Sequence, residues 1–524
     1  NQRMISKQGA VNKIAGVMAG LFMLMLLTGC GSGRASFSAS RKYAPDILQK
    51  DYQVYRSLLE THHPGLYWYT SKDSMDYFFN WGRQQLNDSL TEPQFRKILS
   101  YVTAKVNCGH TTVRPSKAWN KYSDTARLGK MFPLSMKLWG GNTPNDEMKM
   151  VVTANLNRRD SILRRGTEIL SINGRSKELI VDSLFSFIST DGYNSTHKFQ
   201  SLSNRGLFGS LYTNIFGISE KYQVEYRDSS GTTRQIIIPV YNPAADTVGR
   251  GTRTFRPSSQ SQPTKKQQRE LRKNSIRLLR MDTANHSAMM DLASFGKGYN
   301  LKKFFHQSFE ALEKNGITHL IIDLRSNGGG SVTNSTLITR YIANHPFKIA
   351  DSLYAVKKGS PWARYIQDHF WNKLFIKFFT KKRADGYYHF GYFERHAFKP
   401  KKNHHFDGQV YILTGGNSFS ASTLFASALL KQDNVTIVGE ETGGGAYGNS
   451  AWLIPDATLP ETGIRFRLPL FRLVIDKNTP KNGKGVQPEV LALPTVDDIR
   501  KNADFKVIRT MELIRNHKEG VKKN

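Results

Sequence analysis

Two segments that each join a buried strand to a helix through a turn of small residues place the strongest constraint on this fold. The first is THLIIDLRSNGGGSVTNSTLITRYI (residues 318–342), and the second is GQVYILTGGNSFSASTLFASALL (residues 408–430). Each begins with a run of apolar residues, which is typical of a strand buried on both faces of a sheet. The pair predicts an α/β core in which each turn leads into a helix N-terminus, where unpaired N–H groups can bind a ligand.

The residues of the two turns are those that acyl transfer requires. Three consecutive glycines (residues 328–330) allow close backbone approach, and Ser418, Ser420 and Ser422 place hydroxyls at the start of a helix. Oxyanion donors beside a candidate nucleophile indicate acyl transfer. Ser420 precedes the helix expected from Ala421, so a purely structural helix cap is the alternative for this residue.

These motifs resemble those of the C-terminal processing (tail-specific) serine peptidases. DLRSNGGG, SFSAS and GKGVQPEV occur in the family's order, and the upstream CGHTTV and HPGLYWY runs are similar to the tricorn-like branch, which uses histidine. The resemblance covers most of the chain after residue 40. It implies an α/β multidomain protein with a core similar to the ββα fold of Clp protease and crotonase, a PDZ-like β domain and an N-terminal helical domain.

The resemblance implies Ser420 as the nucleophile, with Ser418 and Ser422 as alternatives in register. It also implies an oxyanion hole formed by the backbone N–H groups of Ala421 and Gly330, with Gly329 as the next-best donor. In the family's classical branch a lysine follows a Gly-Glu-x-Thr element and serves as the base. Here the element reads GEETGGG (439–445), and glycine stands where the lysine would be. The chain therefore needs another base.

His110, within CGHTTV, is the base that the resemblance implies, because imidazole titrates near neutral pH. The tricorn-like branch orients its histidine through a neighbouring serine and a distant glutamate, but Gly109 precedes His110 here. We take Asp476 as the third member, with Glu489 as the alternative. Cys108 is a second candidate nucleophile, although a small buried thiol is the simpler interpretation. No HExxH motif or Cys/His ligand set occurs in the sequence, so we expect no metal or other cofactor.

The N-terminus has the layout of a bacterial lipoprotein signal. Basic residues precede an apolar run, Ile14–Leu27, that is too short to span a bilayer comfortably. Cys30 follows Leu-Thr-Gly, which resembles the lipobox whose cysteine is lipidated. We expect a signal peptide over residues 1–29 and a tether over residues 30–42 that anchors an outer-membrane lipoprotein facing the periplasm. A plain signal peptide or anchor with an incidental cysteine is the alternative.

Changes of pattern divide the first half of the remaining chain. Helical periodicity predicts a helical domain over residues 43–128 that carries His110, with a helix starting at Leu90-Thr91-Glu92-Pro93. Strand patterns over residues 129–245, with an Asn-Gly turn in TEILSING, predict the PDZ-like domain. Such a domain binds a chain end by strand addition. A β-rich insert without a ligand is the alternative.

The second half begins with a basic stretch over residues 246–280 whose composition is typical of a linker. The peptidase core is expected over residues 281–515, with an aromatic and basic insertion at residues 353–406. Six aromatic residues of this insertion are expected to form its own core: Trp362, Phe370, Trp371, Phe375, Phe378 and Phe379.

The formal net charge of +33 is spread along the chain. No zinc-finger spacing, RNP motif or basic zipper occurs, so no nucleic-acid partner is expected. A solvated basic surface is the simplest interpretation, and attraction to phosphate-bearing membrane lipids is the functional alternative.

The function predicted from these features is a serine endopeptidase that cleaves exported polypeptides and recognises their C-terminal ends. A non-catalytic lipoprotein that holds peptide ends through the PDZ-like module is the alternative. A hydrolase of non-peptide esters is a third and weaker hypothesis, because no G-x-S-x-G elbow is present. The oligomeric state is not predicted. The decisive test is whether the fold brings Ser420 and His110 together.

Overall fold

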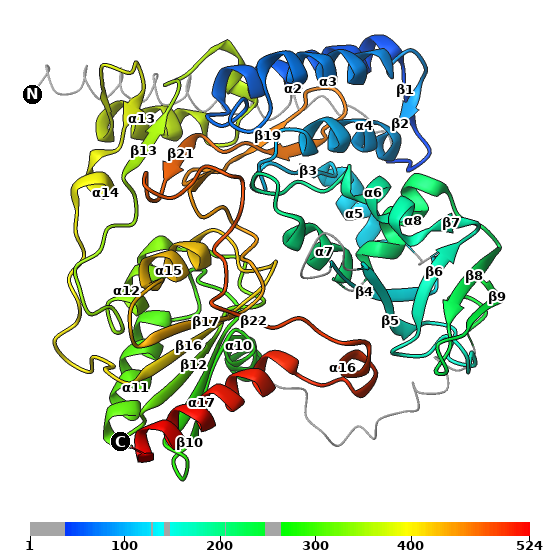
Figure 1. Ribbon diagram of the computed structural model, residues 1–524. Coiled ribbons are helices and arrows are strands. Elements are labelled where there is room, and N and C mark those ends of the chain that lie inside the picture. The colour runs from blue at the N-terminus through cyan, green and yellow to red at the C-terminus, as the bar shows by residue number, and fades with distance from the viewer. Residues whose placement is uncertain (1–36, 127–128, 141–146, 205, 247–263, 524) are drawn as a thin grey trace, which may run out of the picture. The chain divides into compact units, whose positions relative to one another are not determined.

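The computed structural model describes residues 37–126, 129–140, 147–204, 206–246 and 264–523. The chain divides into two compact units, residues 1–41 and 42–524. Every member of the hydrophobic cores found in the described residues belongs to the larger unit, which Figure 1 shows. The expected signal peptide, Cys30 and most of the expected tether lie outside the described residues. No helix in the described ranges is both long and apolar enough to cross a membrane.

Six strands form the sheet of the C-terminal core. In spatial order they are β10 (Arg277–Asp282), β11 (Ser287–Leu292), β12 (His319–Asp323), β16 (Gln409–Thr414), β17 (Val435–Gly439) and β22 (Val490–Leu491). β10 runs antiparallel to β11, and the other neighbours are parallel. Both predicted buried strands, β12 and β16, lie in the middle of this sheet, so the predicted α/β core is confirmed.

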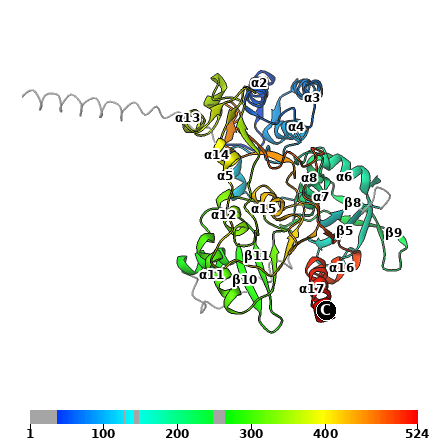
Figure 2. The ribbon, with the colours of Figure 1, turned by 60° about the vertical axis from the view of Figure 1, so that its left-hand side comes forward.

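Helices cover both faces of this sheet, which explains the apolar runs of its central strands. On one face lie α11 (Leu301–Lys314), α12 (Val332–Thr339) and α15 (Ala421–Leu429), whose apolar residues share a core with Leu320 and Ile322 of β12. On the other face, Ile514 of α17 (Phe505–Lys523) packs with Ile321. Figure 2 shows α11, α12 and α15 on the side of the sheet away from α17, which follows the short α16 (Val496–Lys501).

Three helices follow the short strand β1 (Lys42–Tyr43) in the N-terminal region: α2 (Pro45–His62), α3 (Lys72–Gln84) and α4 (Glu92–Ala104). Local signals set their starts: Ser71 caps α3, and Thr91 forms a capping box with Gln94 of α4. The helix start predicted at residues 90–93 is confirmed, although Leu90–Thr91 (β2) also pairs with β1. A shorter helix, α5 (Lys117–Thr125), follows the loop that carries His110.

The N-terminal helices do not have a hydrophobic core of their own. Tyr55 of α2 and Phe95 of α4 share one core with Phe466 and Phe471, from the last part of the chain. The rings of Tyr55 and Phe466 lie 5.1 Å apart, centre to centre. Three short strands bond the same two regions: β3 (Val113–Arg114), β20 (Arg465–Arg467) and β19 (Asp456–Thr458). The segment that bears His110 is therefore fixed against the C-terminal half.

The region expected to be PDZ-like is an antiparallel sheet with three helices. Its strands, in spatial order, are β4 (Leu134–Trp139), β5 (Lys149–Asn155), β6 (Glu168–Ile172), β8 (Lys221–Arg227) and β9 (Thr233–Pro239), with β7 (Arg175–Ser176) beside β6. Its helices are α6 (Lys177–Phe185), α7 (Ser195–Ser203) and α8 (Leu207–Phe216). Asn173 and Gly174 have φ of +50° and +73°, so the predicted Asn-Gly turn is present.

The stretch expected to be a linker is ordered where the structure describes it. Thr264 and Gln267 form a capping box that starts α10 (Lys265–Asn274), and β10 follows directly. The low apolar content that suggested a linker is explained by the exposure of α10, none of whose residues is buried. The capping signal at Thr264 outweighs the low apolar content.

The insertion contributes to a second sheet, which is antiparallel. Its strands, in spatial order, are β14 (Lys381–Lys382), β15 (Tyr388–His389), β13 (Ser352–Ala355), β21 (Phe471–Val474) and β18 (Gly448–Ala451). Its helical segments are the 3-10 turn η1 (Pro361–Tyr365), α13 (His369–Phe379) and α14 (Gly391–Arg395). Trp362 and Phe375 pack against the adjacent core, as expected. The other four aromatic residues are exposed, so the expectation of a fully aromatic insert core is wrong.

Candidate active site

Ser420 occupies a strained turn between β16 and α15. It stands at the N-cap position of α15 with φ of +55° and ψ of −116°, and its side chain makes no capping hydrogen bond. Such backbone conformations are costly for a residue other than glycine, at about 1–3 kcal/mol, and they occur mainly at functional sites. The structural alternative of a simple helix cap does not hold here, because the hydroxyl is not used for capping.

The neighbouring serines have structural contacts. Ser418 Oγ donates to the Leu324 carbonyl (2.8 Å) and accepts from the Gly415 N–H (3.1 Å). Ser422 Oγ donates to the Asn327 carbonyl (2.9 Å). Both side chains are fully buried. These contacts tie the serine turn to the glycine turn and leave Ser420 as the hydroxyl of this group that lines a cavity.

The glycine turn lies directly against Ser420. A Cβ on Gly329 would stand 2.7 Å from the Cβ of Ser420 and 2.9 Å from the backbone nitrogen of Ala421, and Gly329 has φ of +98°. Only glycine fits this position. The two predicted turns therefore meet.

Two backbone donors at this junction are free to bind an oxyanion. In the part of the chain that the structure describes, the N–H groups of Gly330 and Ala421 donate no hydrogen bond. The N–H of Gly329 donates to Asn327 Oδ1 (2.9 Å), so the expectation of Gly329 as a next-best donor is wrong. Gly330 and Ser420 line the same cavity, whereas Gly329 does not.

That cavity has a volume of about 280 Å³ and holds room for a substrate side chain. Its walls are mainly apolar, formed by Val332, Leu424, Ala451, Trp452, Ile454 and Leu473. Lys297, Thr333 and Asn449 supply polar groups to the lining. The Oδ1 of Asn449 is buried and has no partner among the described residues, so it is available to a ligand N–H.

No side chain fits where the classical branch has its lysine. A Cβ on Gly443 would clash with the Gly416 carbonyl, and one on Gly444 would clash with Thr423 Oγ1. The virtual Cβ of Gly444 also lies 3.1 Å from the backbone nitrogen of Ser420. The Gly416 carbonyl and the Thr423 hydroxyl fill this region, so it has no room for a lysine side chain.

His110 lies against the residue that precedes the candidate nucleophile. The rings of His110 and Phe419 are 5.0 Å apart, centre to centre. The His110 side chain is buried, and neither ring nitrogen has a hydrogen-bond partner among the described residues. The structure thus brings His110 to the Ser420 turn without a hydrogen bond between the two side chains. Burial lowers the pKa of His110 to about 3, with the charge of Arg467 adding to the effect, so the ring is neutral at physiological pH.

Phe419 explains the glycine before His110. A Cβ on Gly109 would clash with Cζ of Phe419. The aromatic ring fills the place of any side chain at position 109, so the neighbouring-serine relay of the tricorn-like branch has no room here. The HPGLYWY run holds the same loop from the other side, where His63 Nε2 and Thr111 Oγ1 are 2.8 Å apart.

Asp191 is a site residue that the sequence did not reveal. Its carboxylate accepts hydrogen bonds from the N–H groups of Gly109 (2.8 Å) and Gly445 (3.2 Å), so it joins the His110 loop to the glycine loop that replaces the lysine. Polar atoms of Asp191, His110 and Cys108 lie within 4.8 Å of one another. Burial raises the pKa of Asp191 to about 6, against the opposing effect of these hydrogen bonds. Asp191 lies between α6 and α7 in a segment without a catalytic motif.

This buried cluster is unsuited to thiolate chemistry. Burial raises the pKa of the Cys108 thiol to about 11, so it stays protonated near neutral pH. The guanidinium of Arg472 lies close enough to lower the pKa of His110 and stands 3.3 Å from the centre of the Trp68 ring. We therefore assign Cys108 a packing role.

The structure does not bring either predicted third member to His110. Asp476 accepts hydrogen bonds from the Asn478 N–H (2.8 Å) and the Thr479 hydroxyl (3.3 Å), both within its own turn. Glu489 accepts from the Ile437 N–H (2.8 Å) and fixes β17. The choice of Asp476 as orienter is corrected accordingly, because its carboxylate stabilises a local turn.

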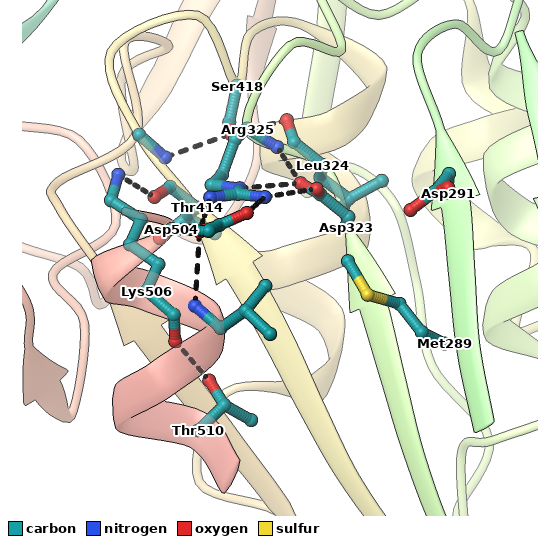
Figure 3. Close-up of polar contacts among 12 residues, drawn as sticks. Met289, Asp291, Asp323, Leu324, Arg325, Thr414, Ser418, Asp504, Lys506 and Thr510 are labelled. Carbon is teal, nitrogen blue, oxygen red and sulfur yellow. Dashed lines mark hydrogen bonds and ion pairs between the residues drawn. The ribbon is translucent and has the colours of Figure 1, made fainter. Parts of the chain in front are cut away.

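The carboxyl ends of the core strands are braced by the C-terminal helix. Lys506 of α17 donates to the Thr414 carbonyl (2.8 Å) and to Glu440 (2.6 Å). Arg325 bonds Asp323 and Asp504, and Ser418 bonds Leu324 in the same region (Figure 3). The two turns that flank Ser420 start from these braced strand ends.

We expect Lys506→Met to destabilise the fold by about 3–5 kcal/mol, because it leaves the buried Glu440 carboxylate without its partner. Urea unfolding followed by circular dichroism measures this change. Lys501→Met is the matched control, since Lys501 pairs with Asp497 at the surface and its loss should leave the midpoint unchanged. Equal midpoints for Lys506→Met and the parent protein would contradict a bracing role.

Residues 286–492 match peptidase family S41. That match lies on the segment that holds both turns. The chain carries a peptidase S41 domain. It is a serine-type peptidase, and the family predicted from the motifs is confirmed.

Solved structures show the same fold beyond this domain. Mature CPAF complexed with lactacystin is 14% identical, with 91% of this chain and 98% of that chain covered at a TM-score of 0.60. A mutant of CPAF is 13% identical, with 90% and 98% covered at a TM-score of 0.61. Both likenesses therefore extend over the N-terminal helices and the β domain of this S41 peptidase. No curated protein matches the sequence.

Proposed function

We propose that this S41 peptidase cleaves polypeptides with Ser420 as nucleophile and His110 as general base. The observation that carries the proposal is the strained, uncapped Ser420 beside two free backbone donors, with a neutral imidazole packed on the adjacent residue. Ser420 Oγ attacks the peptide carbonyl, and the N–H groups of Gly330 and Ala421 receive the developing oxyanion. His110 takes the hydroxyl proton and passes it to the leaving amine.

The His110 ring must approach the hydroxyl when substrate binds. Hydrogen bonds of catalytic groups are often long in the free enzyme and tighten in the substrate complex. The loop of Gly109 and His110 would have to move past Phe419, whose ring the imidazole contacts in the free protein. Water then hydrolyses the acyl-enzyme ester with the same histidine as base.

We assign Asp191 the role of positioning residue for this histidine. Its carboxylate holds the Gly109 N–H, and when ionised it favours a protonated His110 nearby. It replaces the orienter that the sequence placed at Asp476.

We expect kcat/KM of the parent enzyme to rise with pH through about 6, where Asp191 ionises. Below that pH the carboxyl is neutral and gives less support to an imidazolium. Asp191→Asn should remove this rise and lower kcat/KM by about 10²-fold, the scale for one lost electrostatic contact in an active site. Asp407→Asn is the control, because this surface carboxylate contacts only His405 at 2.7 Å among the side chains described. If kcat/KM of Asp191→Asn still rose with pH through about 6, the rise would come from another titrating group.

Acylation by a serine-directed fluorophosphonate tests the proposed nucleophile. Mass spectrometry should locate the adduct on Ser420 and on neither of the buried serines beside it. An adduct on another serine would contradict the assignment.

A non-catalytic peptide-holding role is the second candidate, favoured by the absence of a hydrogen-bonded partner for His110 among the described residues. Peptide binding without any acylation would select this candidate over the peptidase mechanism.

Recognition of a substrate's C-terminal end is proposed for the β4–β9 domain. β9 is an edge strand of its sheet, and a cavity of about 580 Å³ lies beside it. Ile236 and Ile238 of β9 line this cavity together with Arg158 and Arg159. An extended chain could pair with β9 while a guanidinium binds its carboxylate. Amidation of a peptide's C-terminus should then weaken its binding.

We further propose that the protein is anchored in the bacterial cell envelope through Cys30 and acts on exported polypeptides. The Leu-Thr-Gly-Cys sequence after an apolar run supports this placement. Detection of a lipid-modified Cys30 in the mature protein is the check; an unmodified cysteine would contradict the anchor.

A further inference from the structure

The helix α13 of the insertion exposes four large aromatic side chains. The exposed fractions are 57% for Phe370, 68% for Trp371, 70% for Phe378 and 61% for Phe379. Contiguous apolar exposure of this kind marks an interaction surface in soluble proteins. α13 lies at the periphery of the molecule in both ribbon views (Figures 1 and 2).

Three of these aromatic residues form one apolar ridge together with Leu374. Phe370, Leu374 and Phe378 recur every four residues, and Trp371 stands seven residues before Phe378, so all four lie on one side of the helix. The opposite side is anchored: Ile376 is 2% exposed. The helix is thus held to the protein by one face and presents the other.

Basic residues border the ridge. Lys373 and Lys377 are exposed, four residues apart and next to Phe370 around the helix. Lys381, Lys382 and Arg383 follow directly and are also exposed. The insertion, residues 353–406, contains 12 Lys or Arg against 3 Asp or Glu.

We propose that the exposed face of α13, defined by Phe370, Trp371, Leu374 and Phe378 with Lys373 and Lys377, docks on an anionic membrane surface. The aromatic rings enter the boundary between headgroups and acyl chains, which is the position that amphipathic interfacial helices occupy. The lysines extend alongside and place their ammonium groups at the lipid phosphates. The attraction of the basic protein to membrane phosphates, which the net charge suggested, is thus assigned to this helix.

A second copy of the chain fits this surface poorly. In a two-fold symmetric contact the same patch meets itself, so the rows of Lys373 and Lys377 would face like charges. A lipid bilayer supplies both the apolar layer and the opposite charge. The chemistry of the surface therefore selects the membrane.

Vesicle binding tests the proposal on residues 42–524, the compact unit that contains every hydrophobic core of the described chain. This unit lacks the apolar run of residues 14–27, which would itself bind lipid. We expect it to co-sediment with vesicles of phosphatidylcholine and phosphatidylglycerol, and to bind phosphatidylcholine alone much more weakly. The triple variant Phe370→Ser, Trp371→Ser, Phe378→Ser should partition about 100-fold less. Lys373→Glu with Lys377→Glu should reduce partitioning by about tenfold at low salt.

Three control variants test whether vesicle binding is specific to this face. Tyr77→Ser and Ile237→Ser each remove a side chain that is 65% exposed on another part of the molecule, and both should bind as the parent does. Lys265→Glu with Lys266→Glu, on the exposed helix α10, matches the charge change. Unchanged peptidase activity of the α13 variants verifies that they fold.

Equal binding of the α13 variants and the parent to anionic vesicles would overturn the proposal, as would no binding by the parent. A parent dimer that becomes a monomer in the triple variant, without vesicle binding, would assign the surface to self-association instead. None of these outcomes involves Ser420, so the result is independent of the proposed catalytic mechanism.

Discussion

Ser420→Ala should abolish peptide hydrolysis and fluorophosphonate labelling while the protein remains folded. The change removes one oxygen that makes no structural hydrogen bond among the described residues, so stability should be nearly unaffected. The expected loss in kcat is about 10⁶-fold, the scale for removal of a catalytic serine. Single-turnover assays with a fluorogenic peptide measure the residual rate.

Ser422→Ala is the informative comparison, because its hydroxyl is two residues away and donates to the Asn327 carbonyl. This variant should keep its labelling and lose some stability instead. A Ser420→Ala enzyme that still hydrolyses peptides and still reacts with the probe would refute the assignment of the nucleophile.

His110→Ala should reduce the rate of acylation by a factor near that of Ser420→Ala, about 10⁵. Without an imidazole, no described side chain at this turn replaces the base, since glycines occupy the place of the classical lysine. Substitution also leaves a buried hole in which added imidazole can bind. We expect imidazole to restore part of the rate in His110→Ala and none in Ser420→Ala.

Lys431→Ala serves as the control for a hidden Ser–Lys mechanism, because Lys431 follows α15, the helix that begins directly after Ser420. It should leave the acylation rate unchanged. A strong loss in Lys431→Ala together with a mild effect of His110→Ala would reverse our choice of base.

The sequence predicted those features whose causes are local. The Asn-Gly turn, the capped start of α4 and the strand–turn–helix units around Gly329 and Ser420 each depend on residues adjacent in the chain. The contact between the turns of Gly329 and Ser420 was also predictable from the sequence, because neighbouring parallel strands place their carboxyl ends at the same edge of a sheet.

Features that depend on contacts between distant segments were not accessible. Asp191 has no motif around it, and its role arises only where it bonds Gly109 and Gly445. Asp476 appeared suitable from its position before GKGVQPEV, but its carboxylate is used within its own turn. The aromatic pattern of α13 has the same periodicity whether the helix is buried or exposed, so sequence alone could not decide that point.

The common core of the first and last segments has a consequence for synthesis of this enzyme. Phe95, just before the loop of His110, needs Phe466 and Phe471 to complete its surroundings. When Ser420 has just been synthesised, the growing chain still lacks those two phenylalanines. The imidazole of His110 is then not yet held in its position in the fold. Proteolytic competence should therefore arise only after Phe466 and Phe471 have been synthesised, which protects unfinished copies and their neighbours from premature cleavage.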